Sequence, residues 1–370
     1  MKVCQIYNIA SHYRTAIYSL IDKTYDCELY CSKNMTDIKT MDFSVLNGKV
    51  HEVKTINIGR ATYQIGIPRL AFKRYDAYLV TGDTWSISTW LFLLISRMLG
   101  KRVYLWTHGL LGREGTVRKF FNVLFIRFAK GAFLYGNRAK ELLVNAGVNP
   151  ANLFVIHNSL DYERQLMLRK EGLSSDVYYN HFKNNGKKII FIGRLTRVKR
   201  LDLLVSALEL LANKGHSFNL VFVGGGPEQT HLEQLVEGKG MKERVWFFGP
   251  SYDEKQNAEL IYNADLCVAP GNVGLTAMHT MVFGTPVISS NDFNSQMPEH
   301  EAIIDGKTGA FFENGNLESL ADAIKKWFEL HPDREQVRKD CYNEIDNNWT
   351  PSFQMGVIKS VLKNANTTSN

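Results

Sequence analysis

The sequence feature that most constrains the fold is a regular alternation of short apolar runs with longer amphipathic segments. Near-continuous apolar runs are typical of parallel strands that are covered on both faces. Segments 200–214 and 317–330 have the periodicity of amphipathic helices. The pattern therefore predicts a doubly wound α/β fold. The expected strands are residues 3–7, 26–31, 77–81, 102–106, 132–135, 153–157, 188–192, 220–223, 245–248, 266–269 and 286–289.

The expected strands fall into two groups separated by the polar segment 161–187, which we interpret as a linker with a lead-in helix. A chain of 370 residues exceeds one ordinary domain, and each group restarts the strand–helix pattern. We therefore predict two domains, residues 1–160 and 161–350. Thr350 as a cap, followed by Pro351 in the first turn, predicts a final helix over 351–364.

Composition limits the class of protein and its partners. The five cysteines are scattered, so they predict neither a disulfide framework nor a metal site, and they favour a reducing compartment. The sequence has no secretory signal and no apolar run of spanning length, which predicts a cytoplasmic protein. The net charge of +7 predicts an anionic partner. No nucleic-acid-binding motif is present, so we expect that partner to be a phosphate compound or an anionic membrane surface.

Ligands of parallel sheets bind at the carboxyl ends of the strands, which directs attention to the loops that follow them. One expected strand ends at Gly193 and is followed at once by Arg194 and Lys199. Arginine can bind two phosphate oxygens at once, and lysine supplies a mobile point charge. The residues alone leave two interpretations open: a phosphate site, or a solvated run of charges before a helix.

A second glycine-rich loop follows the strand expected at 266–269 and leads into a helix expected at about 275–283. Its glycines let the backbone approach a ligand, and the free N–H groups of the first helical turn favour an anion. The histidine in this helix either reaches that ligand or is an ordinary core histidine. The candidate ligand contacts are Gly271, Val273, Gly274, Leu275, Thr276 and His279.

In their order and spacing these segments resemble the donor domain of family 4 retaining glycosyltransferases, which have the GT-B fold. A third cluster, 224–226, is weak evidence by itself because a tight turn explains it. The matching segments are Phe191-Ile192-Gly193-Arg194-Leu195 with Lys199, Val223-Gly224-Gly225-Gly226-Pro227, Val245-Trp246-Phe247-Phe248-Gly249, Ala264-Asp265, Gly274-Leu275, Gly284-Thr285-Pro286-Val287-Ile288, Glu301 and Asp305-Gly306-Lys307-Thr308-Gly309. In the first half, Tyr13-Arg14, Trp106-Thr107-His108-Gly109 and His157-Asn158-Ser159-Leu160-Asp161 fit more loosely.

The resemblance implies two Rossmann-like domains facing a cleft. The first domain, joined by the C-terminal helix, would bind the acceptor, and the second would bind a nucleotide-sugar donor. Arg194 and Lys199 would bind the donor diphosphate, and His108 would lie over the donor sugar beside the acceptor. The remaining nucleotide contacts implied are Gly193, Gly225 and Gly249.

The implied activity is retaining transfer of a hexose from a UDP- or GDP-sugar to a glycan or lipid-linked acceptor, as in bacterial surface polysaccharide or lipopolysaccharide synthesis. No Asp-x-Asp pair is present, so we expect neither a metal nor a further cofactor. The family has two glutamates eight positions apart, and counting from Gly274 places Gly271 and His279 there. This departure keeps a second interpretation open, a non-catalytic nucleotide-sugar-binding homologue or partner subunit.

Two rival enzyme classes fit the residues less well. An epimerase of the same fold needs carboxylates at the sugar, where Gly271 has none. An NAD-dependent oxidoreductase needs a dinucleotide fingerprint, which is missing.

Segment 116–130 alternates phenylalanines with Arg118, Lys119, Arg127 and Lys130. It predicts either a helix on the anionic inner face of the plasma membrane or a core-facing helix with basic ends.

Overall fold

The computed structural model describes residues 1–32 and 39–367 and confirms the α/β architecture. The chain divides into two compact units, Met1–Asp161 with Thr350–Asn370, and Tyr162–Trp349. Segment 161–187, interpreted above as a linker with a lead-in helix, forms two helices of the second unit, α5 (Tyr162–Glu171) and α6 (Val177–Phe182). Tyr178 of α6 is buried and donates a hydrogen bond to Leu260 O, so this segment packs rather than bridges.

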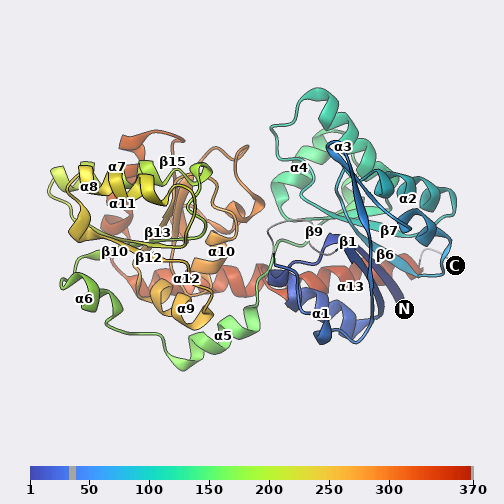
Figure 1. Cartoon of the computed structure of the whole chain (residues 1–370), viewed down its shortest axis with the longest axis horizontal. Helices are drawn as coiled ribbons and strands as arrows, with labels where there is room; N and C mark the ends of the chain where they lie inside the picture. Colours follow the sequence, from blue (N-terminus) through green and yellow to red (C-terminus); the bar gives the residue numbers. More distant parts are fainter. Residues whose placement is uncertain (33–38, 368–370) are drawn as a thin grey trace. The chain divides into compact units, whose positions relative to one another are not determined.

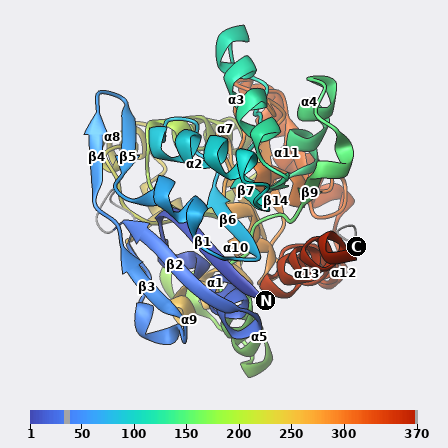
Figure 2. The ribbon, with the colours of Figure 1, turned by 90° about the vertical axis from the view of Figure 1, so that its right-hand side faces the viewer.

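The first unit is built on a parallel sheet in the order β3-β2-β1-β6-β7-β8-β9. The central strands pair in register, with Val3 of β1 opposite both Cys27 and Ala77. These strands are largely buried because helices cover both faces. The strands are β1 (Lys2–Ile9), β2 (Asp26–Ser32), β3 (Lys49–Glu52), β6 (Ala77–Thr81), β7 (Val103–Thr107), β8 (Gly131–Leu134) and β9 (Leu153–Val155). A separate hairpin joins β4 (Thr55–Ile58) to β5 (Ala61–Gln64), as Figure 2 shows.

Two helical layers cover this sheet (Figures 1 and 2). One face packs against α1 (Thr15–Thr24) and α13 (Pro351–Thr367), which contact each other. Gln354 of α13 accepts a hydrogen bond from Ser159 Oγ at 2.7 Å, so the end of the chain is fastened to the first unit. The other face carries α2 (Ile87–Met98), α3 (Thr116–Phe128), α4 (Asn137–Asn145) and the 3₁₀ helix η3 (Ile67–Phe72).

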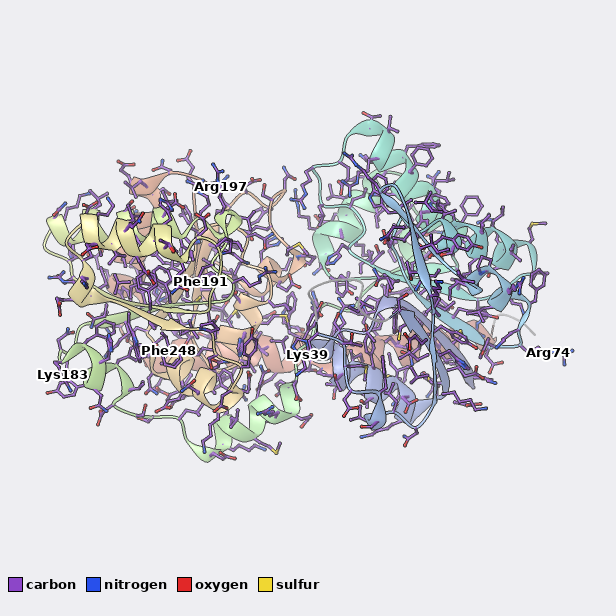
Figure 3. The ribbon with its side chains drawn as sticks, viewed as in Figure 1. Lys39, Arg74, Lys183, Phe191, Arg197 and Phe248 are labelled. Atoms are coloured by element: carbon purple, nitrogen blue, oxygen red, sulfur yellow. The ribbon has the colours of Figure 1, made fainter. Side chains whose placement is uncertain are left out.

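The second unit has a parallel sheet in the order β12-β11-β10-β13-β14-β15. Phe191 is buried within it, whereas Arg197 lies on the surface (Figure 3). The strands are β10 (Lys187–Ile192), β11 (Phe218–Val223), β12 (Val245–Gly249), β13 (Leu266–Ala269), β14 (Val287–Ser290) and β15 (Gly309–Phe312). The further helices are α7 (Leu201–Asn213), α8 (Gln229–Gly238), α9 (Glu254–Asn263), α10 (Thr276–Met281), α11 (Leu317–Leu330) and α12 (Arg334–Asn348).

Each sheet reverses its strand order at one point, between β1 and β6 in the first unit and between β10 and β13 in the second. Ligands of open α/β sheets bind at the carboxyl ends of the strands beside such a reversal. The topology therefore selects the loops after β1 and β6, and those after β10 and β13.

Three features of the described residues bear on other classes of protein. None of their helices is long and apolar enough to cross a membrane. No group of three or more His, Cys, Asp or Glu residues among them could hold a metal ion. The five cysteines are all buried.

Candidate active site

The loops after β10 and β13 are bonded to each other through their backbones. Gly271 N–H donates to Lys199 O at 3.0 Å, and Asn272 N–H donates to Val198 O at 3.2 Å. The cationic and the glycine-rich segments predicted from the sequence are thus brought together at the strand reversal of the second unit.

The side chain of Lys199, from the loop after β10, contacts the glycine-rich loop. Its Nζ donates to Asn272 O at 2.6 Å and lies 3.5 Å from Val273 O. Burial lowers the pKa of this ammonium from its ordinary value. An ammonium has three hydrogens, so one that holds carbonyls can still donate to an anion beside Gly274.

The other cations of this segment have distinct roles. Arg194 is exposed, and no carboxylate of the described residues pairs with it. Arg200 pairs with Asp202 at 3.5 Å in the first turn of α7, which is the ordinary helix-end role considered above. The structure therefore leaves Arg194 and Arg197 exposed, and the family resemblance selects Arg194 as the one expected to bind the ligand.

Glycines allow the loops after β10, β11 and β12 to approach closely. Gly193 and Gly224 have φ values of 146° and 144°, which residues with a side chain rarely adopt. Gly224 N–H donates to Gly249 O at 2.9 Å, and Leu195 N–H donates to Gly225 O at 3.0 Å. These glycines let three loops form one surface at the end of the sheet.

Gly271 has a steric reason to be glycine. A Cβ there would overlap the backbone carbonyl oxygen of Val198 and lie 2.9 Å from Lys199 C. In this backbone no side chain fits at the position that the resemblance assigns to the first glutamate.

Helix α10 is shorter than the helix expected over 275–283, because it spans only Thr276–Met281. Gly284, with φ 78°, follows it and prevents its continuation. The shorter helix therefore has a smaller dipole at its first turn than the predicted helix would have. Thr276 is buried and donates from Oγ1 to Ile192 O at 2.9 Å, which fixes the helix to β10.

Two of the predicted contacts differ in what they offer a ligand. Val273 is fully buried, and its N–H already donates to Gln296 Oε1 at 2.9 Å. It therefore supports the loop. Leu275 is partly buried at the start of the helix, and its carbonyl accepts from His279 N–H at 2.9 Å.

His279 is paired with a carboxylate that sequence reasoning missed. Its Nε2 lies 3.1 Å from Glu254 Oε1, and Gln165 Nε2 donates to the same oxygen at 2.8 Å. Burial opposes ionisation of Glu254, but His279 and Gln165 outweigh it and lower the pKa of the carboxyl. The only signal in the sequence was an acid in the first turn of α9, which favours a helix N-terminus in any protein.

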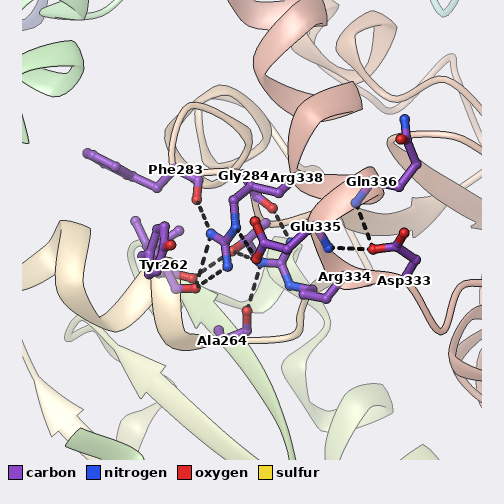
Figure 4. Close-up of polar contacts among 11 residues, drawn as sticks. Tyr262, Ala264, Phe283, Gly284, Asp333, Arg334, Glu335, Gln336 and Arg338 are labelled. Atoms are coloured by element: carbon purple, nitrogen blue, oxygen red, sulfur yellow. Dashed lines mark hydrogen bonds and ion pairs between the residues drawn. The ribbon is translucent and has the colours of Figure 1, made fainter. Parts of the chain in front are cut away.

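Two arginines of α12 hold the ends of the helices that carry this pair (Figure 4). Arg338 donates to Phe283 O at 3.1 Å and to Tyr262 O at 3.4 Å. Arg334 donates to Ala264 O at 3.0 Å and also to Gly284 O. The C-terminal ends of α9 and α10 are therefore fixed to one helix, which positions Glu254 and His279.

His108 is the one predicted site residue that belongs to the first unit. It follows β7, and its ring centroid lies 4.6 Å from that of Tyr135. Its Nδ1 is buried without a hydrogen-bond partner. Burial, with a smaller contribution from Arg14, lowers the pKa of His108 to about 4, so the imidazole is neutral at pH 7.

The clustered loops lie within a region that matches a known family. Residues 179–344 match the family model of glycosyl transferases group 1. Among curated glycosyltransferases, D-inositol 3-phosphate glycosyltransferase of Mycobacteroides abscessus is 26% identical over 197 residues, covering 51% of this chain and 42% of that protein. The chain spans less than half the length of the curated relatives that it matches.

Solved glycosyltransferase structures share the fold over nearly the whole chain. Anabaena HepE in complex with UDP has a TM-score of 0.70 at 16% identity, covering 98% of this chain and 99% of that one. The lipopolysaccharide outer core galactosyltransferase WaaB has a TM-score of 0.71 at 16% identity, covering 98% and 100%. The α/β fold of this chain is thus the GT-B fold of those glycosyltransferases.

Proposed function

We propose that this chain is a retaining glycosyltransferase of family 4 that transfers a hexose from a nucleotide-diphosphate sugar. The observation that carries the proposal is the bonded pair of loops at the β10/β13 reversal, with Arg194 exposed and Lys199 held against Gly271–Thr276. These loops lie inside the region that matches group 1 glycosyl transferases. HepE has been solved with UDP, and a relative that is 31% identical over 140 residues is a GDP-mannose-dependent mannosyltransferase, so UDP and GDP are both candidate donor nucleotides.

The barrier to such a transfer lies in breaking the bond between the sugar C1 and the diphosphate oxygen. Arg194, Lys199 and the N–H groups of Gly274–Thr276 would stabilise the charge that grows on the β-phosphate. The acceptor oxygen then bonds to C1, and its proton passes to the departing phosphate on the same face. The protein's own cations neutralise the diphosphate, so we expect the transfer to need no metal.

We propose that the His279–Glu254 pair holds the ribose of the donor. His279 stands where the family resemblance places a ribose-binding glutamate. Glu254 engages Nε2 and leaves Nδ1 as the second polar atom of the ring. A carboxylate that fixes one ring nitrogen orients the other toward its ligand.

A second candidate function follows from Gly271. With no room for a side chain there, the sugar loses the contact that the first glutamate of the family provides. A nucleotide-sugar-binding partner subunit without transferase activity would retain Arg194 and Lys199 and bind the donor without turning it over.

The decisive experiment is thermal-shift binding of UDP, GDP and their sugars to wild type, Arg194→Ala and Arg197→Ala. Both arginines are exposed cations of the same loop, so Arg197→Ala is a matched control. A shift with one nucleotide that only Arg194→Ala loses supports the donor site. Absence of any shift contradicts it. Nucleotide release measured with an acceptor panel then separates a transferase from a non-catalytic binder.

We further propose that the first unit binds a glycan or lipid-linked acceptor on the cytoplasmic side of an anionic membrane. Helix α3 has features of both the core-facing helix and the membrane-surface helix considered above. Its Phe125 and Ile126 face the core, while Phe120 is 61% exposed. Helix α2 adds an exposed apolar stripe at helical spacing, Ile87, Leu91, Leu94 and Met98. Residues 84–130 contain eight lysines and arginines and one acid, Glu114, which suits an anionic surface.

An apolar cavity of about 820 Å³ opens beside this surface, within the range of about 300–1,000 Å³ of small-molecule sites. Its walls include Trp85 from the loop after β6, Trp90 from α2 and Phe121 from α3. Trp90 Nε1 donates to Thr84 O at 3.0 Å, so this indole presents an apolar face. We propose that the hydrocarbon chain of the acceptor enters here. Flotation with anionic vesicles tests the surface, and failure of wild type to float would contradict it.

A further inference from the structure

A half-buried cation without a carboxylate partner lies at the strand reversal of the first unit. Arg14 ends the 3₁₀ helix η1 (His12–Arg14), which follows β1. Its guanidinium carbon lies 4.9 Å from the ring centroid of Tyr135 and 5.9 Å from that of Trp106. Among the described residues, no Asp or Glu forms an ion pair with it.

Three polar groups of this cluster are unsatisfied. Arg14 Nε, His108 Nδ1 and Trp106 Nε1 are all buried without a hydrogen-bond partner in the described chain. They follow or end β1 and β7, so they meet at the carboxyl edge where ligands bind. Buried polar groups are nearly always bonded, and one that is not usually has a ligand or a water as its partner.

The charge of the cluster is positive and uncompensated. Burial by itself lowers the pKa of Arg14, but Tyr135, Tyr18 and Tyr13 outweigh it and raise that pKa, so the guanidinium stays charged. The low pKa of His108, about 4, leaves the imidazole neutral at pH 7. Aromatic rings form the surroundings of the guanidinium, and a poorly hydrated cation of this kind favours an anion.

We propose that Arg14, His108 and Trp106 form a site for an anionic group, phosphate or carboxylate, of the acceptor substrate. The inference rests on the proposed function, because it assumes that the first unit binds the acceptor, and it names that acceptor as an acidic or phosphorylated sugar. Arg14 would bind two oxygens of the anion with its planar guanidinium. The Trp106 N–H would donate to the anion, and His108 would orient the neighbouring hydroxyl.

The test is saturation-transfer NMR on the full chain with glucose 6-phosphate, glucuronate and uncharged glucose, and with UDP in separate samples. We expect one of the charged sugars to bind and glucose not to bind. Arg14→Met should weaken that binding by about ten- to a hundredfold, the range for hydrogen bonds to charged groups. Arg74→Met is the matched control, because Arg74 is an exposed cation of the same unit (Figure 3).

The samples with UDP distinguish an anion of the acceptor from the phosphates of the donor. Arg194→Ala should lose UDP and keep the charged sugar, whereas Arg14→Met should do the reverse. If Arg14→Met loses UDP instead, the anion belongs to the donor and the acceptor site is refuted. If UDP fails to bind any form while the charged sugar still depends on Arg14, the donor proposal fails and this one stands.

Stability distinguishes a ligand site from a structural arginine. No carboxylate compensates the charge of Arg14, so its removal should leave the Tm of Arg14→Met close to that of wild type or raised. Arg14→Lys keeps the charge and loses the planar guanidinium. This variant should therefore still fold, and it should bind the charged sugar more weakly than wild type. Unaltered charged-sugar binding in either variant, or no charged-sugar binding by wild type, overturns the proposal.

Discussion

Nε2 of His279 lies 3.1 Å from Oε1 of Glu254, so a histidine–carboxylate pair joins α10 to α9. The side chains are 19% and 20% exposed, and Gln165 fixes the carboxylate from a third helix, α5. The family resemblance predicts a carboxylate at position 279 of α10, where this chain has a histidine, and the carboxylate bonded to that histidine lies on the neighbouring helix α9.

Replacement of Glu254 by glutamine tests this pair. The amide is neutral, so His279 loses the charge that orients it, and we expect the KM for the donor to rise about tenfold with a smaller change in kcat. Steady-state kinetics of Glu254→Gln, His279→Gln and the double variant measure it. The double variant should be little worse than either single one, because both remove the same interaction. Glu237→Gln is the control, because Glu237 is exposed on α8. Strict additivity would show that the residues act separately.

Restoring a glutamate at position 271 should damage the site. Any Cβ there overlaps Val198 O and displaces the backbone that carries Lys199. We expect Gly271→Ala and Gly271→Glu to lower the free energy of unfolding by more than about 2 kcal/mol and to abolish nucleotide binding. Gly238→Ala is the control, since the space beside Gly238 is open. A stable Gly271→Glu variant that binds and transfers faster than wild type would contradict this steric account. Urea unfolding and isothermal titration give both quantities.

Acid should destabilise the first unit through His108. Its pKa is about 4 in the folded chain against an ordinary 6.5, so between these values the unfolded chain binds more protons. Stability from this group is therefore complete above pH 6.5 and is lost as the pH falls toward 4. A shift of this size corresponds to about 3 kcal/mol. The charged or titratable neighbours are Arg14 from η1 and Tyr135 after β8.

The measurement is urea unfolding of wild type and His108→Phe across that pH range. The difference between the two curves should appear below pH 6.5 and level off near 4. Glu28 acts in a lower window, because its folded pKa is about 2. Parallel curves would show that His108 is not the responsible group.

Filling the apolar cavity should block a hydrocarbon chain without disturbing the fold. Gly115 lines the cavity and has an ordinary φ of −66°, and a Cβ there meets nothing within 4 Å. Excluding two methylene groups weakens binding about tenfold, so Gly115→Leu should bind a lipid chain at least that much less tightly. Quenching of tryptophan fluorescence by brominated phosphatidylglycerol vesicles reports entry, because Trp85 is 47% exposed beside the cavity.

Gly238→Leu is the matched control for this substitution, since it adds the same side chain to open space in α8 of the second unit. Equal quenching in Gly115→Leu and wild type would show that the chain does not enter. Quenching that persists in Trp85→Phe would show that another tryptophan is the one quenched.

Strands that are covered on both faces could be predicted well from the sequence. Ala77–Thr81 and Leu266–Ala269 are apolar at nearly every position and form β6 and β13 with those bounds. The hairpin β4–β5 was missed because nearly all of its residues are exposed or only partly buried, with Ile58 at 52% exposure, and they carry no continuous apolar signal. Sheet-edge strand β3 was missed for the same reason, since it is only partly buried.

The meeting of Lys199 with the Gly271 loop followed from local sequence, because loops at the same end of adjacent parallel strands must lie close together. The sequence by itself thus determined the α/β class, the two groups of strands and the loops that carry the cations. The pairing of Glu254 with His279, and the approach of Arg14 to the ring of Tyr135, depended on the tertiary structure. Each pair joins elements whose helical or strand pattern is complete without the partner, so only the packing of the sheets and helices brings the two side chains together.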